Sequence, residues 1–441
     1  MQGFPANAPV RTAHVTRSLP SRFTGWIRSP SVRVAALFAF AGIGFAGGNL
    51  LLARALTRSE FGLVALWLAV YYLGGALAPW GADGIVNRRR ILPGWRLFRR
   101  VLFTSAVTAG LAVVVANLLY PFSPVHLALL GFGIVALGIG TVAAAQFQAR
   151  HRFLTAMSIW QGSNIVLLFV AVGTVLWSDP GVLLPVAVFT GGAALVAVAG
   201  WLGLRRVHEE EEDVTGDPYE WGEALSYYLA ASATAFLPQI ERLFIPRVLS
   251  LEDLAVFGVL AALVISPYRM LQSGVGYTLF PRLRAAPSRR ERRRLLGEEL
   301  RTMAVIGGGA GIAVWYLAPW VTGLFLGDKY ELGSELVLAG LVAGIAKLVG
   351  ALGRALVSAL GSTRDLALYG TASWVALAAA GVGAVFGARW GVPGVIYGTT
   401  AGLLIRSLLA LVLGLRHVTG PERALDRRTI DEEPAPRLEV S

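Results

Sequence analysis

The chain lacks cysteine and is poor in charged residues. None of its 441 residues is Cys, which excludes disulfides, thiol catalysis and thiolate metal sites. Only 15% are charged, whereas 55% are hydrophobic and the mean hydropathy is +0.61. This composition indicates a membrane protein and not a set of soluble domains.

Arrangements of residues that indicate an enzyme are also missing. No Walker-type phosphate loop and no serine-nucleophile motif occurs in the sequence. None of the five histidines has metal-ligand spacing to another His, Asp or Glu, and His126 is expected to form hydrogen bonds at a helix end. These histidines are His14, His126, His151, His208 and His417. We therefore predict that the protein is not an enzyme and binds no metal, cofactor or nucleic acid.

Apolar runs of about twenty residues recur along the chain, and this is the length that crosses ~30 Å of hydrocarbon. They predict an all-α integral membrane protein with twelve transmembrane helices. The runs are 34–54, 61–80, 101–120, 126–147, 154–177, 182–203, 223–244, 254–281, 302–326, 334–360, 366–388 and 392–415.

The basic residues that lie between the runs predict the orientation. Most of them fall in alternate connections, the first of which is the Arg-bearing segment 1–33. Because short cytoplasmic loops carry an excess of Lys and Arg, we expect both termini on the cytoplasmic side of the cell membrane. We interpret 1–33 as a retained tail, since a signal peptide has a shorter charged region and a shorter apolar core.

The longest inner connection divides the chain. Residues 205–222 include the acidic run Glu209 to Asp213, and we interpret them as a solvated linker, not a metal or partner site. The predicted units are a bundle at 34–204 and a bundle at 223–416. Tails at 1–33 and 417–441 flank them.

An internal repeat supports two similar halves. Segments 54–72 and 247–268 match once three extra residues are allowed in the second turn, and RFLTA (152–156) matches RDLAL (364–368). The matched residues of the first pair are Arg54, Leu56, Thr57, Phe61, Gly62, Ala65 and Tyr72 against Arg247, Leu249, Ser250, Phe257, Gly258, Ala261 and Tyr268. Since both halves run from inside to inside, we expect an axis along the membrane normal and a central cavity.

Four cationic residues lie within the apolar runs of the second half: Arg269, Lys347, Arg354 and Arg406. Lys347 and Arg354 are seven residues apart and hence lie two turns along one helix face. A charge in lipid is costly, so we expect these groups to face water or an anionic ligand. The alternative is that they extend to the interface, for which Arg354 and Arg406 are best placed.

The first half contributes uncharged polar residues to the spans, namely Asn49, Gln146, Gln161 and Asn164. They are candidates for ligand contact, although such residues also commonly form hydrogen bonds between helices.

Charged residues near the helix ends are candidates for gating or coupling: Arg54, Glu241, Arg242 and Arg247. The equivalent Arg54 and Arg247 either anchor an interface or form an external gate. The basic loop from Arg282 to Arg294 is suited to anionic lipid headgroups at ~1 kcal/mol per charge, and topology determination explains it equally well.

The chain resembles the polysaccharide-transporter flippases of the multidrug/oligosaccharidyl-lipid/polysaccharide (MOP) exporter superfamily over nearly its whole length. The segments that carry the resemblance are LLARALTRSEFGLVALW (51–67), QFQARHRF (146–153), QIERLFIPRVLSLEDLAVFGVLAA (239–262), TLFPRLR (278–284) and GVPGVIYGTTAGLLIRSLLALVL (391–413). Members often carry Asp where Glu241 stands, which leaves a coupling role for Glu241 open.

The resemblance implies a V-shaped pair of six-helix bundles around a central cavity. It implies alternating-access transfer of an undecaprenyl-pyrophosphate-linked oligosaccharide from the inner to the outer leaflet, for O-antigen, capsule or exopolysaccharide synthesis. It further implies a polysaccharide polymerase and chain-length proteins as partners, membrane lipids around the helices, and coupling to H⁺ or Na⁺.

Three alternatives remain open at this point. A cation-coupled multidrug exporter needs membrane carboxylates, which the first-half spans lack. A lipid II flippase usually has fourteen helices. A membrane glycosyltransferase or polymerase needs catalytic carboxylates or histidines and usually a larger outer loop.

Overall fold

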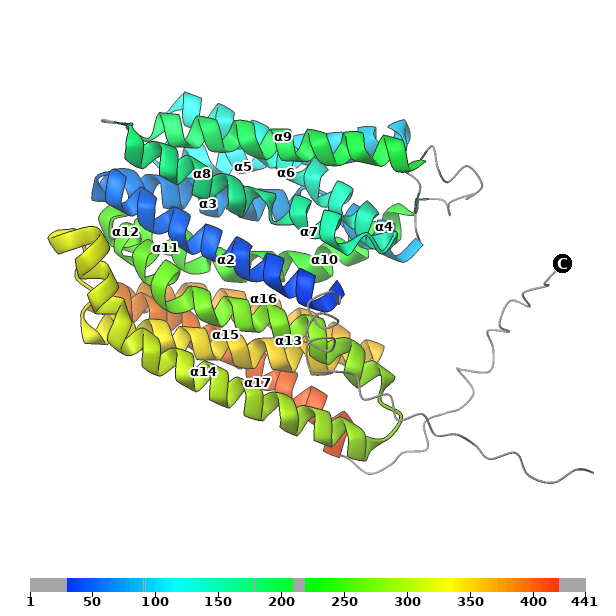
Figure 1. Ribbon diagram of the computed structural model, residues 1–441. Helices are drawn as coiled ribbons and strands as arrows, with labels where there is room; N and C mark the ends of the chain where they lie inside the picture. Colours follow the sequence, from blue (N-terminus) through cyan, green and yellow to red (C-terminus); the bar gives the residue numbers. More distant parts are fainter. Residues whose placement is uncertain (1–29, 90, 92, 178–179, 209–218, 420–441) are drawn as a thin grey trace, which may run out of the picture.

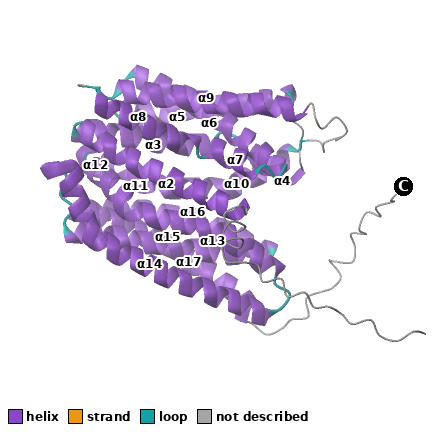
Figure 2. Cartoon of the chain, in the orientation of Figure 1, coloured by secondary structure: helices purple, strands orange, loops and turns teal. Residues whose placement is uncertain are grey.

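The computed structural model describes residues 30–419 except 90, 92, 178–179 and 209–218. Within this part the chain is helical, with short loops and no strand (Figure 2). The predicted tails and the acidic run Glu209 to Asp213 lie largely or wholly outside it. The all-α prediction is confirmed.

Residues 30–208, where the structure describes them, form eight helices. They are α2 (Pro30–Ala55), α3 (Arg58–Leu77), α4 (Ala82–Arg89), α5 (Trp95–Leu119), α6 (Pro124–Ala149), α7 (Phe153–Trp160), α8 (Gly162–Leu176) and α9 (Leu183–His208).

The second half begins with α10, and several of its spans are interrupted by short 3₁₀ or π segments. Its elements are α10 (Trp221–Phe236), η1 (Leu237–Gln239), α11 (Ile240–Val248), α12 (Leu251–Leu260), η2 (Ala261–Ile265), α13 (Ser266–Ala285), α14 (Arg289–Leu326), η3 (Gly327–Lys329), α15 (Ser334–Leu360), α16 (Thr363–Gly387), η4 (Ala388–Trp390) and α17 (Gly391–Thr419).

The predicted twelve spans correspond to single helices or to joined segments. Among the described residues eight runs are long and apolar enough to cross a membrane, and the bent pair α7–α8 is a ninth. One of the eight, Thr363–Val418, contains two predicted spans, α16 and α17. The remaining spans correspond to α2 and to α10–η1–α11.

The helices group into two bundles. Helices α5, α6 and α9 lie on one side of the molecule, and α14, α15 and α17 lie on the other (Figure 1). Helix α10 packs against α3 and α4 of the first bundle and also against α16 of the second. It therefore bridges the two.

The predicted basic loop Arg282 to Arg294 is largely helical, which corrects that expectation. Helix α13 continues to Ala285, and α14 begins at Arg289 after Ser288, whose hydroxyl accepts a hydrogen bond from the Glu291 backbone N–H at 3.2 Å. This is a normal N-cap interaction. Leu295 and Leu296 are buried one turn later, so the helix extends beyond its apolar run because it has its own cap and buried face.

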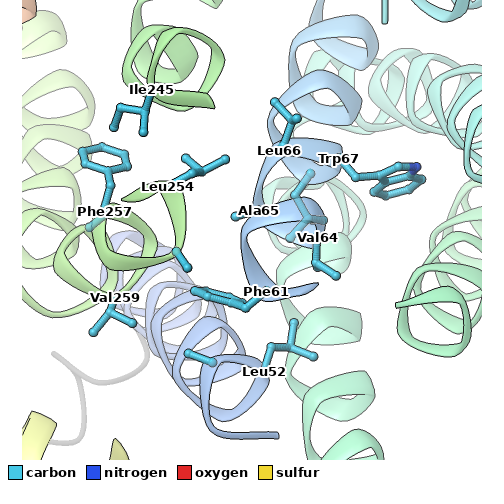
Figure 3. Packing of buried hydrophobic residues seen from close by; sticks show 14 of the residues in the cluster. Leu52, Phe61, Val64, Ala65, Leu66, Trp67, Ile245, Leu254, Phe257 and Val259 are labelled. Atoms are coloured by element: carbon cyan, nitrogen blue, oxygen red, sulfur yellow. The ribbon is translucent and has the colours of Figure 1, made fainter. Parts of the chain in front are cut away.

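The repeated segments pack against each other at the bundle interface. Figure 3 shows Phe61 and Ala65 facing Leu254 and Phe257, on the closely packed helices α3 and α12. A methyl group on Gly62 would lie 2.0 Å from the Leu251 carbonyl oxygen. The two backbones approach closely because position 62 has no side chain.

Helices α16 and α17 form a tight hairpin that turns at Gly391, whose φ is 67°. Methyl groups on Gly383 or Gly398 would lie 2.3 or 2.0 Å from the carbonyl oxygen of the other. In a membrane the hydrophobic effect does not drive helices together. Helices associate there through close van der Waals contacts, which small residues such as these allow.

Candidate functional site

A cavity of about 380 Å³ lies between α7 of the first bundle and several helices of the second. Its lining comprises Trp160, Thr234, Leu237, Pro238, Arg269, Gln272, Ala346, Lys347, Gly350, Arg354, Leu403, Arg406 and Ser407. Only Trp160 among these comes from the first bundle. The volume is typical of a small-ligand pocket.

All four predicted intramembrane cations line this cavity. Arg269 projects from α13, Lys347 and Arg354 from α15, and Arg406 from α17. The two α15 residues share a wall because seven residues are nearly two helical turns. The structure thus brings these residues together, and their binding of substrate stays a prediction.

Two breaks in the spans contribute residues to the cavity lining, and a third precedes a lining residue by one turn. Helices α7 and α8 meet at 47° beside Trp160, and η1 supplies the lining residues Leu237 and Pro238. The π segment η2 precedes Arg269 by one turn. Local breaks of this kind change which face of a helix a side chain occupies and recur at functional sites.

Glu241 forms an ion pair with Lys347. Glu241 Oε1 lies 2.8 Å from Lys347 Nζ, and the exposed fractions of the two side chains are 0% and 13%. The second carboxylate oxygen, Oε2, is buried without a hydrogen-bond partner among the described residues. Glu241 therefore balances only part of the positive charge around it.

Arg242 lies beside Arg269 around a first-bundle aromatic ring. The guanidinium carbons of Arg242 and Arg269 lie 5.3 and 5.4 Å from the centroid of Phe45 in α2. Cation–π attraction stabilises such positions. One guanidinium nitrogen of the buried Arg242 has no hydrogen-bond partner within the described residues, so this region can accept a further anionic or polar group.

Arg406 lies over Tyr369 of α16, with its guanidinium carbon 4.8 Å from the ring centroid, and donates a hydrogen bond to the Tyr369 hydroxyl. The charge of Arg406 also acts on the neighbouring Arg354. Arg354 makes no hydrogen bond or ion pair with any other described residue. Aromatic contacts thus hold Arg406 at the cavity, whereas no described carboxylate neutralises Arg354 there.

The balance of charge is strongly positive. Five cations, namely Arg242, Arg269, Lys347, Arg354 and Arg406, have one described carboxylate among them, Glu241. Buried charges are tolerated when they are paired or hydrated, and unpaired ones of like sign repel. A polyanion would relieve this repulsion, so the arrangement suits a ligand with several negative charges.

The uncharged candidates of the first bundle do not line the cavity, and they bond within their own bundle. Asn49 donates to the Phe45 carbonyl at 2.7 Å. Gln146 donates to the Ile91 carbonyl at 2.8 Å and accepts from Arg150 at 2.5 Å. Both are fully buried. The Asn49 bond lies within α2, whereas Gln146 joins α6 to the loop at Ile91.

Gln161 and Asn164 belong to a hydrogen-bonded chain beside the α7–α8 bend. The Tyr72 hydroxyl donates to Asn164 Oδ1 at 3.0 Å, and Asn164 Nδ2 donates to Gln161 Oε1 at 2.6 Å. The chain ends next to Trp160, which lines the cavity.

The predicted gating residues other than Glu241 and Arg242 lie at one end of the molecule. Arg247 donates to the Leu119 carbonyl of the first bundle at 2.9 Å, and Arg54 is exposed. A stronger link was missed in the sequence: Lys329 donates to the carbonyls of Ala53 and Leu56 at the end of α2. A lysine is well suited to these free carbonyls, because the C-terminus of a helix carries partial negative charge.

Sequence reasoning also missed Trp160, Tyr369 and Phe45. Each is an ordinary aromatic residue in an apolar run, so its type and spacing gave no signal. Among the described residues, no group of three His, Asp or Glu side chains could hold a metal ion.

The fold is similar to solved structures of MOP-superfamily transporters. "Lipid II flippase MurJ, inward closed conformation" is 14% identical with a TM-score of 0.57, and the match covers 86% of each chain. An inward-facing multidrug-resistance MATE transporter of the MOP superfamily is 12% identical with a TM-score of 0.56, over 87% of this chain and 98% of that one. A ligand complex of the MATE multidrug transporter DinF-BH is 14% identical with a TM-score of 0.57, over 90% of this chain and 97% of that one.

These identities establish the fold alone, and a comparison with curated protein sequences found no match. The fold is that of a multi-pass membrane protein with the MOP arrangement of two six-helix bundles. A sequence-family model described as "Polysaccharide biosynthesis protein" matches residues 51–335, which is more than half of the chain. The chain therefore belongs to this family of polysaccharide biosynthesis proteins, as its resemblance to polysaccharide transporters predicted.

Proposed function

We propose that the protein is a flippase that moves undecaprenyl-pyrophosphate-linked oligosaccharide units from the inner to the outer leaflet of the cell membrane. Its products would feed the synthesis of a surface polysaccharide. The observation that carries the proposal is the cavity on which Arg269, Lys347, Arg354 and Arg406 converge. Membership in the polysaccharide biosynthesis family and the transporter fold support it.

The chemistry of the cavity matches a diphosphate. Phosphate oxygens accept charge-assisted hydrogen bonds from guanidinium and ammonium groups, and such bonds are about twice as strong as neutral ones. They would offset the cost of removing the diphosphate from water. A cavity of about 380 Å³ suits a head group, and the long polyprenyl chain would remain in lipid.

The membrane potential favours the proposed direction. Moving one charge across 100 mV is worth about 2.3 kcal/mol, so two negative charges leaving a negative interior would gain roughly twice that. Return of a cationic cavity or of a coupled ion would reduce this gain. Coupling to H⁺ or Na⁺ and partnership with a polymerase or chain-length protein remain predictions.

The cavity does not favour the multidrug alternative. Its lining residues include four cations and no carboxylate, and Glu241 behind them is already paired with Lys347. A cationic drug would add positive charge to this region, where like charges repel.

Purified protein in liposomes tests the proposal. The liposomes would contain a fluorescent polyprenyl-diphosphate-linked disaccharide, and transfer would be followed by the access of a membrane-impermeant quencher. We expect wild-type protein to accelerate exchange between leaflets and Arg269→Ala/Lys347→Ala to abolish the acceleration. The matched control is Arg364→Ala, which removes an exposed arginine. Equal exchange by the double variant and the wild type would contradict the proposal.

A further inference from the structure

Trp160 faces the cationic wall from the other bundle. It is the last residue of α7, at the 47° bend into α8, and it lines the cavity. Its side chain is half exposed, at 51%. Because Trp160 is among the lining residues, part of its indole ring is available to a ligand in the cavity.

Neutral hydrogen-bonding groups line the same cavity as this ring. Gln272 supplies an amide and Thr234 a hydroxyl. On the first bundle, the chain from Tyr72 through Asn164 ends on Gln161 Oε1 and holds the residue that follows Trp160. The region thus combines one aromatic face with several uncharged donors and acceptors.

This combination differs from the cationic wall in the ligand that it suits. A diphosphate uses the positive charges and gains little from an indole ring. A polyprenyl chain gains from apolar contact but leaves buried amides unsatisfied, which is costly. A pyranose ring presents a face of C–H groups that can lie on an aromatic ring and a rim of hydroxyls that can bond to amides, and a few placed polar groups of this kind orient ligands in pockets.

We propose that Trp160, with the Gln272 amide and the Thr234 hydroxyl in the same cavity lining, forms a saccharide subsite that takes the first sugar of the lipid-linked substrate. This inference rests on the proposed function, because the cations opposite are assigned to the adjoining diphosphate. The subsite takes neutral or acidic sugars, since no carboxylate is among the residues that line the cavity. The aromatic ring of the first bundle then contacts the sugar, while the cations of the second bundle bind the diphosphate.

The test uses full-length protein in detergent and two ligands, a short-chain polyprenyl diphosphate and the same molecule carrying one glucose on the diphosphate. Affinities would be measured calorimetrically for the wild type, Trp160→Leu and Trp160→Phe. We expect Trp160→Leu to weaken binding of the glucosylated ligand about tenfold, a loss in the range of one aromatic stacking contact. Binding of the bare diphosphate should stay within about twofold, and Trp160→Phe should restore most of the loss.

Trp320→Leu is the matched control, because Trp320 is 63% exposed on α14 and is absent from the cavity lining. Equal losses for both ligands in Trp160→Leu, or no loss for either, would overturn the subsite and leave the diphosphate site standing. A wild type that binds neither ligand would overturn both proposals. Retained glucose discrimination in Trp160→Leu together with a loss in Trp320→Leu would place the sugar elsewhere.

Discussion

The two bundles match where they touch and differ where they face the cavity. At the α3–α12 contact the repeated Phe and Gly residues pack on one another, and a side chain on Gly258 would meet the Phe61 ring at 2.9 Å. At the cavity the second bundle supplies four cations, whereas the first supplies the uncharged Trp160. The two halves can thus keep similar residues at the contact between them while their polar residues differ. Packing at the contact restricts the size of its side chains, whereas the ligand restricts the charge of the side chains at the cavity.

A cationic side chain of the second bundle also forms hydrogen bonds with backbone carbonyl groups of the first. Lys329 of the second bundle donates to the carbonyls of Ala53 and Leu56, and Arg58 of the first bundle donates back to the Lys329 carbonyl. Within the second bundle the charge of Lys347 is met by Glu241. Substitution should therefore change the stability of the protein by different amounts for a cation bonded to carbonyls, a cation paired with a carboxylate and a cation that lines the cavity.

The largest effect is expected at the carboxylate. Glu241→Ala leaves Lys347 unpaired among other cations, and removing one partner of a buried ion pair typically costs about 3–5 kcal/mol. Lys347→Met should cost less, because the charge of Glu241 still acts on Arg242 and Arg269. Unfolding in detergent, followed for both variants and their combination, measures the difference. A greater loss in Lys347→Met would show that Glu241 is not the counter-charge of this cluster.

The second-largest loss of stability is expected at the α3–α12 contact between the bundles. Gly62→Ala places a methyl group against the Leu251 backbone, and overpacking of this kind costs about 1–3 kcal/mol. The strain should separate the bundles at α3–α12 and expose this region to thiol reagents. Because the chain has no native cysteine, a single Ala65→Cys reporter at a fully buried position of this contact measures the change.

Gly173→Ala serves as the control for that prediction, since a methyl group there meets no atom within 4 Å. It should leave labelling unchanged and stabilise the helix by up to about 1 kcal/mol. Unchanged labelling in Gly62→Ala would argue against a tight bundle contact at this position.

Loss of the lysine contact should have a smaller effect. Lys329→Met removes charged hydrogen bonds to the end of α2, and partial exposure of Lys329 limits the expected loss to about 1–2 kcal/mol. Thermal unfolding measures it, with Arg364→Met as the exposed-cation control. Identical melting of the two variants would exclude Lys329 as a link between the bundles.

The smallest effect on stability is expected for a cavity cation that has no described counter-charge. Arg354→Met removes repulsion with Arg406, so the free energy of unfolding should change by less than about 0.5 kcal/mol or rise. The same variant should bind inorganic pyrophosphate more weakly than the wild type in a calorimetric titration. A large destabilisation would mean that Arg354 supports the fold and is not held for a ligand.

Much of the architecture followed from local patterns. Apolar runs of membrane-spanning length located the helices. The four cations within those runs predicted a polar cavity, because a charge in lipid must face water or a counter-charge. The repeated Phe61–Gly62 and Phe257–Gly258 pairs indicated two similar halves. The helical extension from Arg289 was not predicted, because its many charged residues suggested a loop. It is a capped helix with buried leucines.

The contacts of the charged residues within the spans could not be predicted from the sequence. Glu241 and Lys347 are 106 residues apart, and Phe45 reaches Arg242 and Arg269 from the other bundle. The family resemblance suggested a role for Glu241 but no partner. Trp160 gave no signal because one tryptophan in an apolar run resembles any other.

The sequence alone determined that this chain is a bundle of membrane helices in two related halves with excess positive charge in the second. Those properties depend on residue type and spacing, which the bilayer selects locally. Only the tertiary structure decided which cations share a cavity, which one has a carboxylate, and which aromatic ring faces them. Such contacts depend on how distant helices bend and pack, and that geometry arises from all of their interactions together.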